Sequence, residues 1–346
     1  MRAPSVTVLI DNYNYGRFIE EAIESVLAQD FPATEMEIVV VDDGSTDDTA
    51  TRVKKYCDRV RYLFKENGGQ ASAFNLGFAE ARGEIIALLD ADDYWLPGKL
   101  QRVMEEFAKD PGLGMVYNKY AALDEATQSV KEENFRAVSG SFAKGDDLFW
   151  YEPHPTSCTS YRRKFLEEIR PVPEELKILA DVWIGLLIPF VAPILALPEC
   201  LTGYRIHGKN LYYAEGSELT PDSIRTRVKV TQLMVGKMTP WLDGRGYAGR
   251  PDVHAFVERL RLYGETEEFK LSSPGRFHYF RHQVSSNLCY GKRLTWRNRV
   301  INYVTALGTL MAGYQRRDRV LAWAEKSARW LWQWPGRSVG TRRAGN

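Results

Sequence analysis

Short apolar runs and segments with helical spacing alternate along the N-terminal part of the chain. The apolar runs are rich in β-branched residues and are typical of buried strands; they span residues 6–10, 38–41, 60–64 and 85–89. Between them, apolar positions recur every three or four residues, which predicts helices over residues 17–27, 48–56 and 71–81. Strands that alternate with helices over short connections favour right-handed crossovers. The pattern therefore predicts an α/β fold with a mainly parallel sheet flanked by helices.

Acidic residues follow three of these predicted strands. The run at 85–89 ends in three carboxylates within four residues. Because the carboxyl ends of parallel strands meet at one edge of a sheet, we expect one cleft to collect Asp11, Asp42, Asp43, Asp90, Asp92 and Asp93. Like charges repel, and a buried core gives no reason to gather them, whereas a hard divalent cation does. The alternative for the last three is an acidic turn that closes a strand end.

Some classes of protein are disfavoured by what the chain lacks. The glycines do not form the spaced dinucleotide-binding fingerprint and no P-loop is present, which argues against hydride transfer and P-loop NTPase activity. Four scattered cysteines show no metal-ligand spacing and predict reduced thiols in a cytosolic protein. No secretory signal is recognisable at residues 6–10. The longest apolar stretch, residues 184–197, contains two prolines and is shorter than a membrane span of about twenty residues.

The formal net charge of +1 hides an uneven distribution along the 346 residues. Residues 291–346 contain twelve Lys/Arg and two Asp/Glu, while the 290 residues before them contain 34 basic and 43 acidic side chains. A basic tail on an acidic body indicates an anionic partner, either a membrane surface or nucleic acid. No nucleic-acid-binding motif supports the second choice, so we expect no nucleic-acid partner.

Apolar stripes over residues 221–332 predict that the C-terminal third is helical. Residues 300–314 are mostly apolar, and beyond them aromatic and basic residues mix: Trp323, Trp330, Trp332 and Trp334 lie among Arg316, Arg319, Lys326 and Arg329. This composition fits a helix in an anionic membrane interface. A cytoplasmic protein would then sit peripherally on the inner face of the plasma membrane. A core-packed helical domain with a basic outer face and a frayed tail fits equally well.

Several motifs occur together in one known family. They are Val6–Ile10 with Tyr13 and Asn14, Val41–Asp47, Asn67–Gly69 with Asn75–Gly77, Asp90–Asp93 with Trp95 and Pro97, Ala180–Trp183, and Tyr204–Asn210. In this order and spacing, the chain resembles the inverting GT-A glycosyltransferases of the large second family. The resemblance covers residues 1–212. It implies a GT-A, Rossmann-like catalytic domain there, and the apolar stripes beyond it predict a separate helical domain over residues 213–346.

Two positions depart from the family pattern. Asp11 stands where many relatives have Pro, Thr or Ser, which bears on how the nucleotide base is held. Phe74 stands where many relatives have Arg beside the Asn, so one cationic contact to the donor is missing. Neither departure touches the acidic motif that the resemblance assigns to the metal.

The resemblance implies roles at a donor site. Asp92 would ligate Mg²⁺ or Mn²⁺ bridging the two phosphates of the donor, and Asp90 would hold the ribose or a metal-bound water. Asp43, or else Asp42, would accept a hydrogen bond from the base, and Tyr13 would stack on that base. The remaining residues on the donor side are Asp11, Asn67 and Ala91. Turn, strand-end or packing roles are the alternatives.

Three later residues complete the implied site. Asp181 is the implied catalytic base, because a carboxylate near hydrophobic walls can have a pKa high enough to accept a hydroxyl proton. Without the resemblance, an ordinary helix N-cap is the favoured role of Asp181. His207 would ligate the metal through a neutral imidazole, or it is a solvated loop residue. Arg205 would clamp phosphate, or it forms a structural salt bridge.

The implied function is therefore metal-dependent transfer of one sugar, with inversion, from a nucleotide-diphosphate donor to a hydroxyl. The acceptor would be a glycan or a lipid-linked glycan in cell-surface polysaccharide biosynthesis. The alternative is a non-catalytic nucleotide-sugar-binding protein or membrane scaffold that retains the fold. The donor sugar and base depend on pocket-wall side chains from loops that the pattern does not place.

Overall fold

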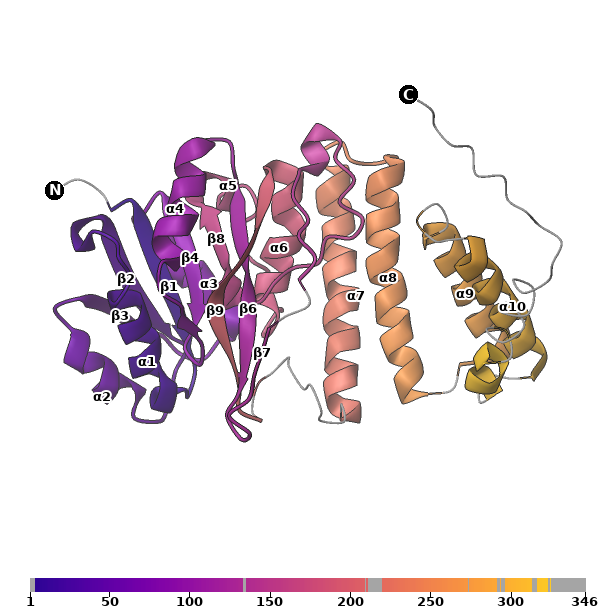
Figure 1. The fold of residues 1–346 in the computed structure, drawn as a ribbon, viewed down its shortest axis with the longest axis horizontal. Coiled ribbons are helices and arrows are strands. Elements are labelled where there is room, and N and C mark those ends of the chain that lie inside the picture. Colours follow the sequence, from indigo (N-terminus) through magenta and orange to yellow (C-terminus); the bar gives the residue numbers. More distant parts are fainter. Residues whose placement is uncertain are drawn as a thin grey trace, which may run out of the picture. The chain divides into compact units, whose positions relative to one another are not determined.

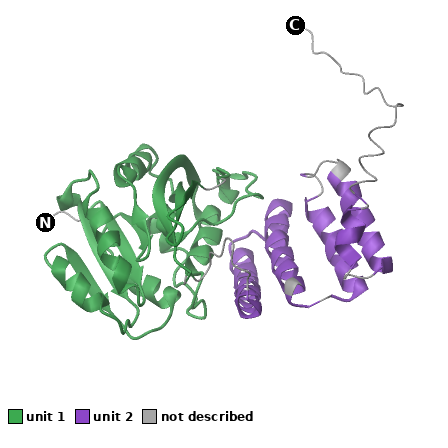
Figure 2. Ribbon diagram, turned by 60° about the horizontal axis from the view of Figure 1, so that its bottom comes forward, with its two compact units in different colours: residues 1–218 green, residues 219–346 purple. Residues whose placement is uncertain are grey.

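The structure is a computed structural model that describes residues 4–132, 135–208, 210, 220–272, 274–290, 293, 296–312, 316–322 and 324. It divides into two compact units, Met1–Glu218 and Leu219–Asn346, which Figure 2 colours separately. The first unit contains the sheet and the acidic residues singled out above, and the second is helical (Figure 1).

One sheet forms the centre of the first unit (Figure 1). Its strands are β1 (Val6–Asn12), β2 (Met36–Asp42), β3 (Val60–Phe64), β4 (Ile85–Asp90), β5 (Tyr94–Trp95), β6 (Met115–Asp124), β7 (Val130–Glu132), β8 (Thr159–Arg162) and β9 (Ile194–Ile206). Their order is β3-β2-β1-β4-β8-β6-β9-β5, with β7 paired to β6. β3, β2, β1 and β4 run parallel to one another, which confirms the predicted α/β fold.

The register of β1 brings the polar strand ends together. Asp11 lies opposite Asp90 of β4, and Asn12 lies opposite Asp42 of β2. The apolar parts of these strands are buried on both faces, as expected for parallel strands between two layers of helices. The acidic residues of β1 and β4 lie only at the carboxyl ends of these strands. The acidic groups therefore meet at the carboxyl edge of the sheet, as predicted.

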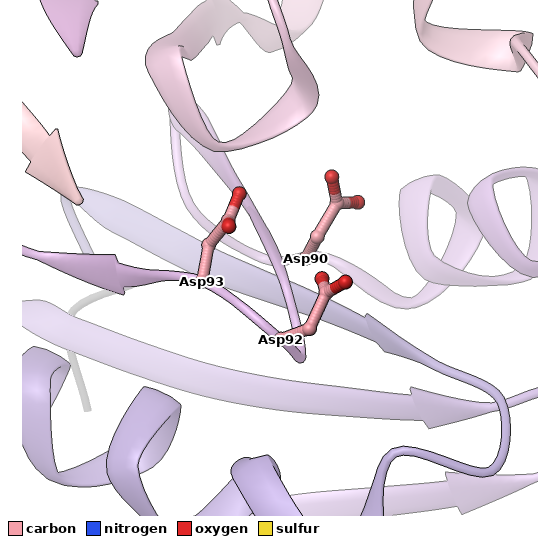
Figure 3. Close-up of side chains that lie close together, drawn as sticks. All are labelled: Asp90, Asp92 and Asp93. Atoms are coloured by element: carbon pink, nitrogen blue, oxygen red, sulfur yellow. The ribbon is translucent and has the colours of Figure 1, made fainter. Parts of the chain in front are cut away.

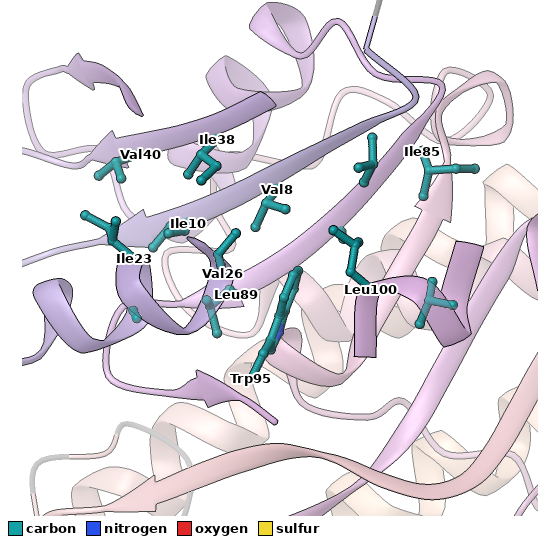
Figure 4. Packing of buried hydrophobic residues seen from close by; sticks show 14 of the residues in the cluster. Val8, Ile10, Ile23, Val26, Ile38, Val40, Ile85, Leu89, Trp95 and Leu100 are labelled. Carbon is teal, nitrogen blue, oxygen red and sulfur yellow. The ribbon is translucent and has the colours of Figure 1, made fainter. Parts of the chain in front are cut away.

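Helices cover the parallel strands. They are α1 (Gly16–Leu27), α2 (Thr49–Val53), α3 (Gln70–Glu80), α4 (Lys99–Lys109), α5 (Arg163–Leu166) and α6 (Ala180–Val191), with 3-10 turns η1 (Ala33–Glu35), η2 (Lys54–Tyr56), η3 (Phe142–Lys144) and η4 (Thr156–Cys158). On one face of the sheet, Val26 of α1 and Leu100 of α4 join Ile10 of β1 and Leu89 of β4 in a single hydrophobic cluster (Figure 4). This cluster anchors the strands whose ends carry the acidic residues.

The second half of the sheet is mixed, and the sequence pattern does not indicate it. β8 runs antiparallel to both β4 and β6, while β9 runs parallel to β6. β5 follows the acidic turn directly and pairs antiparallel with β9. These pairings bring η4 and the end of β9 next to the acidic end of β4, although both lie far away in the sequence.

The described part of the second unit consists of helices, which confirms the predicted helical C-terminal region. They are α7 (Pro221–Asp243), α8 (Pro251–Leu271), α9 (Arg276–Tyr290) and α10 (Trp296–Ala312). α7 packs on α8, and α9 packs on α10. The residues Trp323, Trp330, Trp332, Trp334, Lys326 and Arg329 of the expected membrane-interface segment lie outside the described residues. Among the helices described, none combines the length and the hydropathy that a membrane crossing requires.

α3 packs on the face of β1 opposite the hydrophobic cluster, with Gly77 against the strand. A Cβ at Gly77 would lie 2.6 Å from the methyl carbons of the fully buried Leu9. We expect Gly77→Ala to lower the free energy of unfolding by about 1–3 kcal/mol, because the cost of overpacking exceeds the better helix propensity of Ala. Chemical denaturation followed by circular dichroism measures the change.

The matched control is Gly236→Ala in α7, which adds the same methyl group to a helix interior where nothing lies within 4 Å. This substitution should leave stability unchanged or raise it by up to about 1 kcal/mol. Equal effects of the two substitutions would contradict the close packing of α3 on β1.

Candidate active site

Three carboxylates crowd the carboxyl end of β4. Asp90 is the last residue of β4, and Asp92 and Asp93 lie in the turn that leads into β5. One oxygen of each lies within 4.8 Å of the others. Figure 3 shows the three side chains projecting to the same side of this turn. The sequence run of acids is thus a compact cluster of oxygen ligands and not an extended acidic loop.

Asp11 joins this cluster from the neighbouring strand. Burial raises the pKa of Asp11 to about 7, and a side-chain hydrogen bond with Asp90 offsets part of that rise. The pKa of Asp90 is raised well above its usual range by burial and by the charges of its acidic neighbours, Asp11 first among them. A hydrogen bond between two carboxyl groups needs a proton on one of them. Without a bound cation, Asp11 and Asp90 can therefore lie this close together only if one of them carries a proton.

Asp93 faces the protein. Its Oδ2 accepts a hydrogen bond of 2.6 Å from the Ser157 hydroxyl, and its Oδ1 accepts one of 2.9 Å from the Arg205 backbone N–H. The Ser157 hydroxyl in turn accepts from the Asp90 backbone N–H at 3.0 Å. Burial and the charge of Asp92 nevertheless raise the pKa of Asp93. Both oxygens of Asp93 accept hydrogen bonds that fix the turn. Asp90 and Asp92 are therefore the carboxylates of this cluster that remain available to a ligand.

His207 lies directly beside Asp92. Its Nε2 is 2.9 Å from Asp92 Oδ2, and its side chain is fully buried. The rings of Tyr15 and Phe18 flank the imidazole, with ring centroids at 5.4 and 5.0 Å. The structure thus brings together the two residues proposed as metal ligands, from positions 115 residues apart.

Arg205 is buried next to the acidic turn. Its guanidinium pairs with Glu21 of α1 at 2.7 Å, and its Nε donates to the Asp92 carbonyl oxygen at 2.9 Å. The rings of Phe18 and Tyr94 lie 4.8 and 5.4 Å from the guanidinium carbon. Of the two roles considered for Arg205, these contacts favour the structural salt bridge. They also fix the backbone of Asp92.

The predicted base-binding residues organise a second part of the same edge. Asp43 accepts hydrogen bonds from the backbone N–H groups of Gly68 and Gly69 at 2.9 and 2.7 Å and from Lys65 Nζ at 2.7 Å. The Asn67 side-chain amide donates to the Asp43 carbonyl oxygen at 3.0 Å. Gly69 has φ +86° and lies against the Lys177 backbone, where a Cβ would approach to 2.7 Å. The Asp43 carboxylate therefore shapes the 65–69 loop while keeping some capacity to accept a further bond.

Asp42 and Tyr13 differ in how far they face solvent. Asp42 is buried; its Oδ1 accepts from the Ser45 backbone N–H at 2.9 Å and its Oδ2 accepts from the Tyr62 hydroxyl. Tyr13, which follows the end of β1, is 48% exposed. Tyr13 therefore presents a surface that a planar ring can reach, whereas Asp42 and Asp43 are both buried.

Asp181 lies in the first turn of α6, at the predicted helix start. Burial raises the pKa of Asp181, while hydrogen bonds from the Val182 backbone and from Thr156 lower it in part. The charge of Asp181 raises the pKa values of both Asp11 and Asp90, so Asp181 lies within electrostatic reach of the cluster at β4. A buried carboxylate with a raised pKa is suited to accepting a proton.

A hydrogen-bonded path links the Asp43 loop to Asp181. The Gln70 backbone N–H, directly after Gly69, donates to the Lys177 carbonyl oxygen at 3.0 Å. Gln70 Oε1 then accepts from the Ala180 backbone N–H at 3.0 Å, at the start of α6. Hydrogen bonds of Gln70 therefore connect the 65–69 loop with the start of the helix that carries Asp181.

A buried lysine behind the cluster was not recognised from the sequence. Lys99, the first residue of α4, is 1% exposed. Its ammonium donates to Asn118 Oδ1 at 2.8 Å, to the Ser157 carbonyl oxygen at 2.6 Å and to Thr202 Oγ1 at 2.9 Å. Burial lowers the pKa of Lys99 to about 7, but three acceptors match the three ammonium protons and stabilise the charged form. Nothing in the local pattern marks Lys99, because its acceptors come from three other strands and turns.

The donor set of the cluster fits a divalent cation. Carboxylates suit both Mg²⁺ and Mn²⁺, whereas an imidazole is a better ligand for a transition metal than for Mg²⁺. Asp11 Oδ1 is buried and has no hydrogen-bond partner among the described residues. The raised pKa values of Asp11 and Asp90 express a repulsion between acids that a cation would relieve. The residues at this site therefore match the predicted cofactor in chemistry as well as in position.

Solved structures show the same fold. TarS of S. aureus (residues 1–349), solved with UDP, aligns with a TM-score of 0.57 and 21% identity over 97% of this chain and 94% of that one. The mannosyltransferase PcManGT of Pyrobaculum calidifontis, solved with GDP-Man and Mn²⁺, aligns with a TM-score of 0.53 and 18% identity over 96% of this chain and 88% of that one. These likenesses confirm the predicted GT-A fold.

Sequence comparison identifies the family. Residues 7–170 match the profile of Glycosyl transferase family 2. An uncharacterized glycosyltransferase of Nostoc sp. is 36% identical over 267 residues, which cover 74% of this chain and 81% of that protein. The hyaluronan synthase of Pasteurella multocida is 38% identical over 119 residues, which cover 34% of this chain and 12% of the synthase. This chain therefore belongs to glycosyl transferase family 2 and is an enzyme of the glycosyltransferase class. The matched profile ends before Asp181, Arg205 and His207, whose placement comes from the structure.

Removing the Lys99 ammonium should destabilise the fold. In Lys99→Met, an apolar side chain replaces the one that carries the ammonium group. The three buried acceptors then lose their donor. We expect the free energy of unfolding to fall by about 2–4 kcal/mol, measured by urea denaturation. Lys109→Met on the same helix is the matched control, because the Lys109 side chain is 64% exposed and pairs with Glu106 at the surface. Its effect should stay within about 0.5 kcal/mol, and a comparable loss in both variants would contradict this account of Lys99.

Proposed function

We propose that this chain is a metal-dependent inverting glycosyltransferase that moves a sugar from a nucleotide-diphosphate donor to a hydroxyl of a glycan or lipid-linked glycan. The observation that carries the proposal is the placement of Asp92 beside His207, with Asp90, Asp11 and Asp181 within electrostatic reach. Such a buried set of acids around one imidazole has no structural purpose in a core, and it supplies both cation ligands and a base.

On the donor side, Tyr13 would stack on the base and Asp43 would accept a hydrogen bond from it. The exposure of Tyr13 at the strand end and the position of Asp43 over the 65–69 loop support these roles. Asn67 supports the loop through the Asp43 carbonyl oxygen. The TarS and PcManGT structures contain UDP and GDP-Man, respectively. These ligands support a nucleotide-sugar donor and leave both uridine and guanosine as candidates for its base.

On the phosphate side, Asp92 and His207 would ligate Mg²⁺ or Mn²⁺, with Asp90 and Asp11 nearby and Ala91 between the two motif acids. When bound, the cation would neutralise the charge that develops on the leaving diphosphate. The Mn²⁺ in the PcManGT structure supports this choice of cofactor. Arg205 would act on the donor indirectly, by fixing the backbone of Asp92 through its own bonds to that residue and to Glu21.

On the acceptor side, Asp181 would take the proton of the acceptor hydroxyl. The oxygen then forms a bond to the anomeric carbon as the bond between that carbon and the diphosphate oxygen breaks. Attack from the side opposite the leaving group inverts the anomeric centre, and the proton ends on the Asp181 carboxylate. Burial of Asp181, which raises its pKa, supports its role as the base.

A glycan acceptor in cell-surface polysaccharide biosynthesis is the reading that the comparisons favour. The N-terminal part of the chain is similar to a segment of a hyaluronan synthase, a name that implies a polymeric product for that protein. The predicted domain division, 1–212 catalytic and 213–346 helical, and the predicted location, in the cytoplasm at the inner face of the plasma membrane, belong to the same proposal.

Asp181→Asn tests the catalytic step. Asparagine keeps the shape of the side chain but does not accept a proton, so we expect transfer to fall by about a hundredfold or more while Mn²⁺-dependent nucleotide binding persists. The measurement is sugar transfer from a radiolabelled donor, with calorimetric titration of the nucleotide. Asp58→Asn at an exposed position of the same unit is the control and should behave as wild type. Undiminished transfer by Asp181→Asn would remove the proposed base, and absence of transfer in the wild type with intact binding would favour a non-catalytic binder.

A thermal-shift screen with UDP, GDP and dTDP, each with and without Mn²⁺, tests the donor site. For the correct nucleotide, a hundredfold excess over Kd should raise Tm by about 5 °C or more, and only when Mn²⁺ is present. Asp92→Asn should lose the Mn²⁺-dependent part of this shift because it removes a ligand charge. A shift of equal size without the metal, or in the variant, would contradict the proposed metal site.

A further inference from the structure

α10 exposes an apolar stripe that no described residue covers. Val300, Tyr303, Leu307 and Met311 are 39, 40, 52 and 76% exposed, and their spacing of three or four residues places them along one side of the helix. We call these four residues the α10 stripe. An amphipathic helix normally turns such a side to the core, so the exposed position of the α10 stripe calls for a partner.

The other sides of α10 are already packed within the second unit. Ile301, Thr305 and Thr309 are buried, and α10 packs on α9 along its length. Ile301 also joins a small hydrophobic cluster with Ala324, and Val320 lies so close to Gly308 that a Cβ there would approach it to 2.5 Å. The α10 stripe is therefore a second apolar side, additional to the one that the fold uses.

The surroundings of the α10 stripe are mainly basic, and Asp318, beyond the end of the helix, pairs with Arg317. From Phe269 to Arg317 the sequence contains nine Lys/Arg and no Asp or Glu. Arg299, at the start of the α10 stripe, and Arg316, beyond its end, are exposed. At the far end of the helix, Arg276 of α9 donates to the Met311 carbonyl oxygen at 3.1 Å, next to the 69%-exposed Phe277. Positive charge thus lies at both ends of the apolar side.

We propose that the α10 stripe, with Arg299 and Arg316, docks on an anionic lipid surface. Aliphatic and aromatic side chains enter the boundary between headgroups and acyl chains, while the arginines meet lipid phosphates. At 17 residues α10 is shorter than the about twenty that cross a bilayer, so the helix lies in the plane of the surface. This proposal goes beyond the glycosyl-transfer chemistry and does not depend on it.

The charge pattern decides between a lipid surface and the other candidate occupants. A second copy of the same face would bring arginines against arginines, and the nearby acid Asp318 already pairs with Arg317. Nucleic-acid surfaces combine positive charge with several aromatic rings for stacking, whereas Tyr303 is the one aromatic residue of the α10 stripe. An anionic lipid surface satisfies the apolar centre and the basic ends together.

Vesicle flotation of the full chain is the direct test. We expect the wild type to float with phosphatidylcholine vesicles that contain phosphatidylglycerol and to remain unbound with phosphatidylcholine alone. Leu307→Gln/Met311→Gln should weaken binding by about tenfold or more, because both side chains lose their apolar contact with the acyl region. Arg299→Gln/Arg316→Gln should weaken binding by about tenfold, and added salt should reduce wild-type binding.

The control replaces two exposed apolar residues outside α9 and α10, Val130→Gln/Tyr263→Gln, and should float as the wild type does. All substituted side chains are half-exposed or more exposed, so equal Tm values should show that each variant folds. Equal flotation of Leu307→Gln/Met311→Gln and wild type would overturn the proposal, as would a wild type that does not bind anionic vesicles. A wild-type dimer that the same double substitution converts to monomer, without lipid binding, would assign the α10 stripe to a second copy instead.

Failure of this test is distinguishable from failure of the enzymatic proposal. The Mn²⁺-dependent thermal shift with nucleotide is measured without vesicles and should be identical in the wild type and in Leu307→Gln/Met311→Gln. A variant that loses flotation but keeps that shift separates membrane docking from donor binding.

Discussion

Repulsion among buried carboxylates is the constraint around which the first unit is built. The end of β4 holds Asp90, Asp92 and Asp93 within a few ångströms of one another, and β1 adds Asp11. Such a group persists in a folded protein only if each acid is protonated, hydrogen-bonded or bound to a cation. The groups that meet this need come from distant parts of the chain, through η4 and the end of β9. Mixed strand order in the second half of the sheet is what delivers them.

The acids of the cluster are stabilised in different ways. Some hold the turn in shape, and others remain available to a ligand. Asp93 is satisfied by the Ser157 hydroxyl and a backbone N–H, so it holds the turn in shape. Lys99 lies behind the same Ser157 and supports it from within the core. Asp92 and His207 satisfy each other through one contact of 2.9 Å. Asp93 and Lys99 thus support the turn that orients Asp92.

The proposed donor loop and the proposed base are connected by hydrogen bonds in this arrangement. The 65–69 loop is held by Asp43, and the next residue, Gln70, binds both the Lys177 carbonyl oxygen and the start of α6. The second unit has a different surface chemistry, with exposed apolar residues and arginines on and beside α10.

The amino-acid sequence alone determined the alternation of strands and helices over the first hundred residues or so, and with it the edge where Asp11, Asp43 and Asp90 lie. Apolar periodicity and strand-end polarity are local properties, so they are readable without a fold. The pairing of Asp92 with His207, the inward orientation of Asp93 and the burial of Lys99 were decided by tertiary structure. Each depends on contacts between residues far apart in the chain, and the strand order that creates those contacts leaves no local pattern. The exposure of the α10 stripe belongs to the same group, because periodicity shows that a helix has an apolar side but not whether another element covers it.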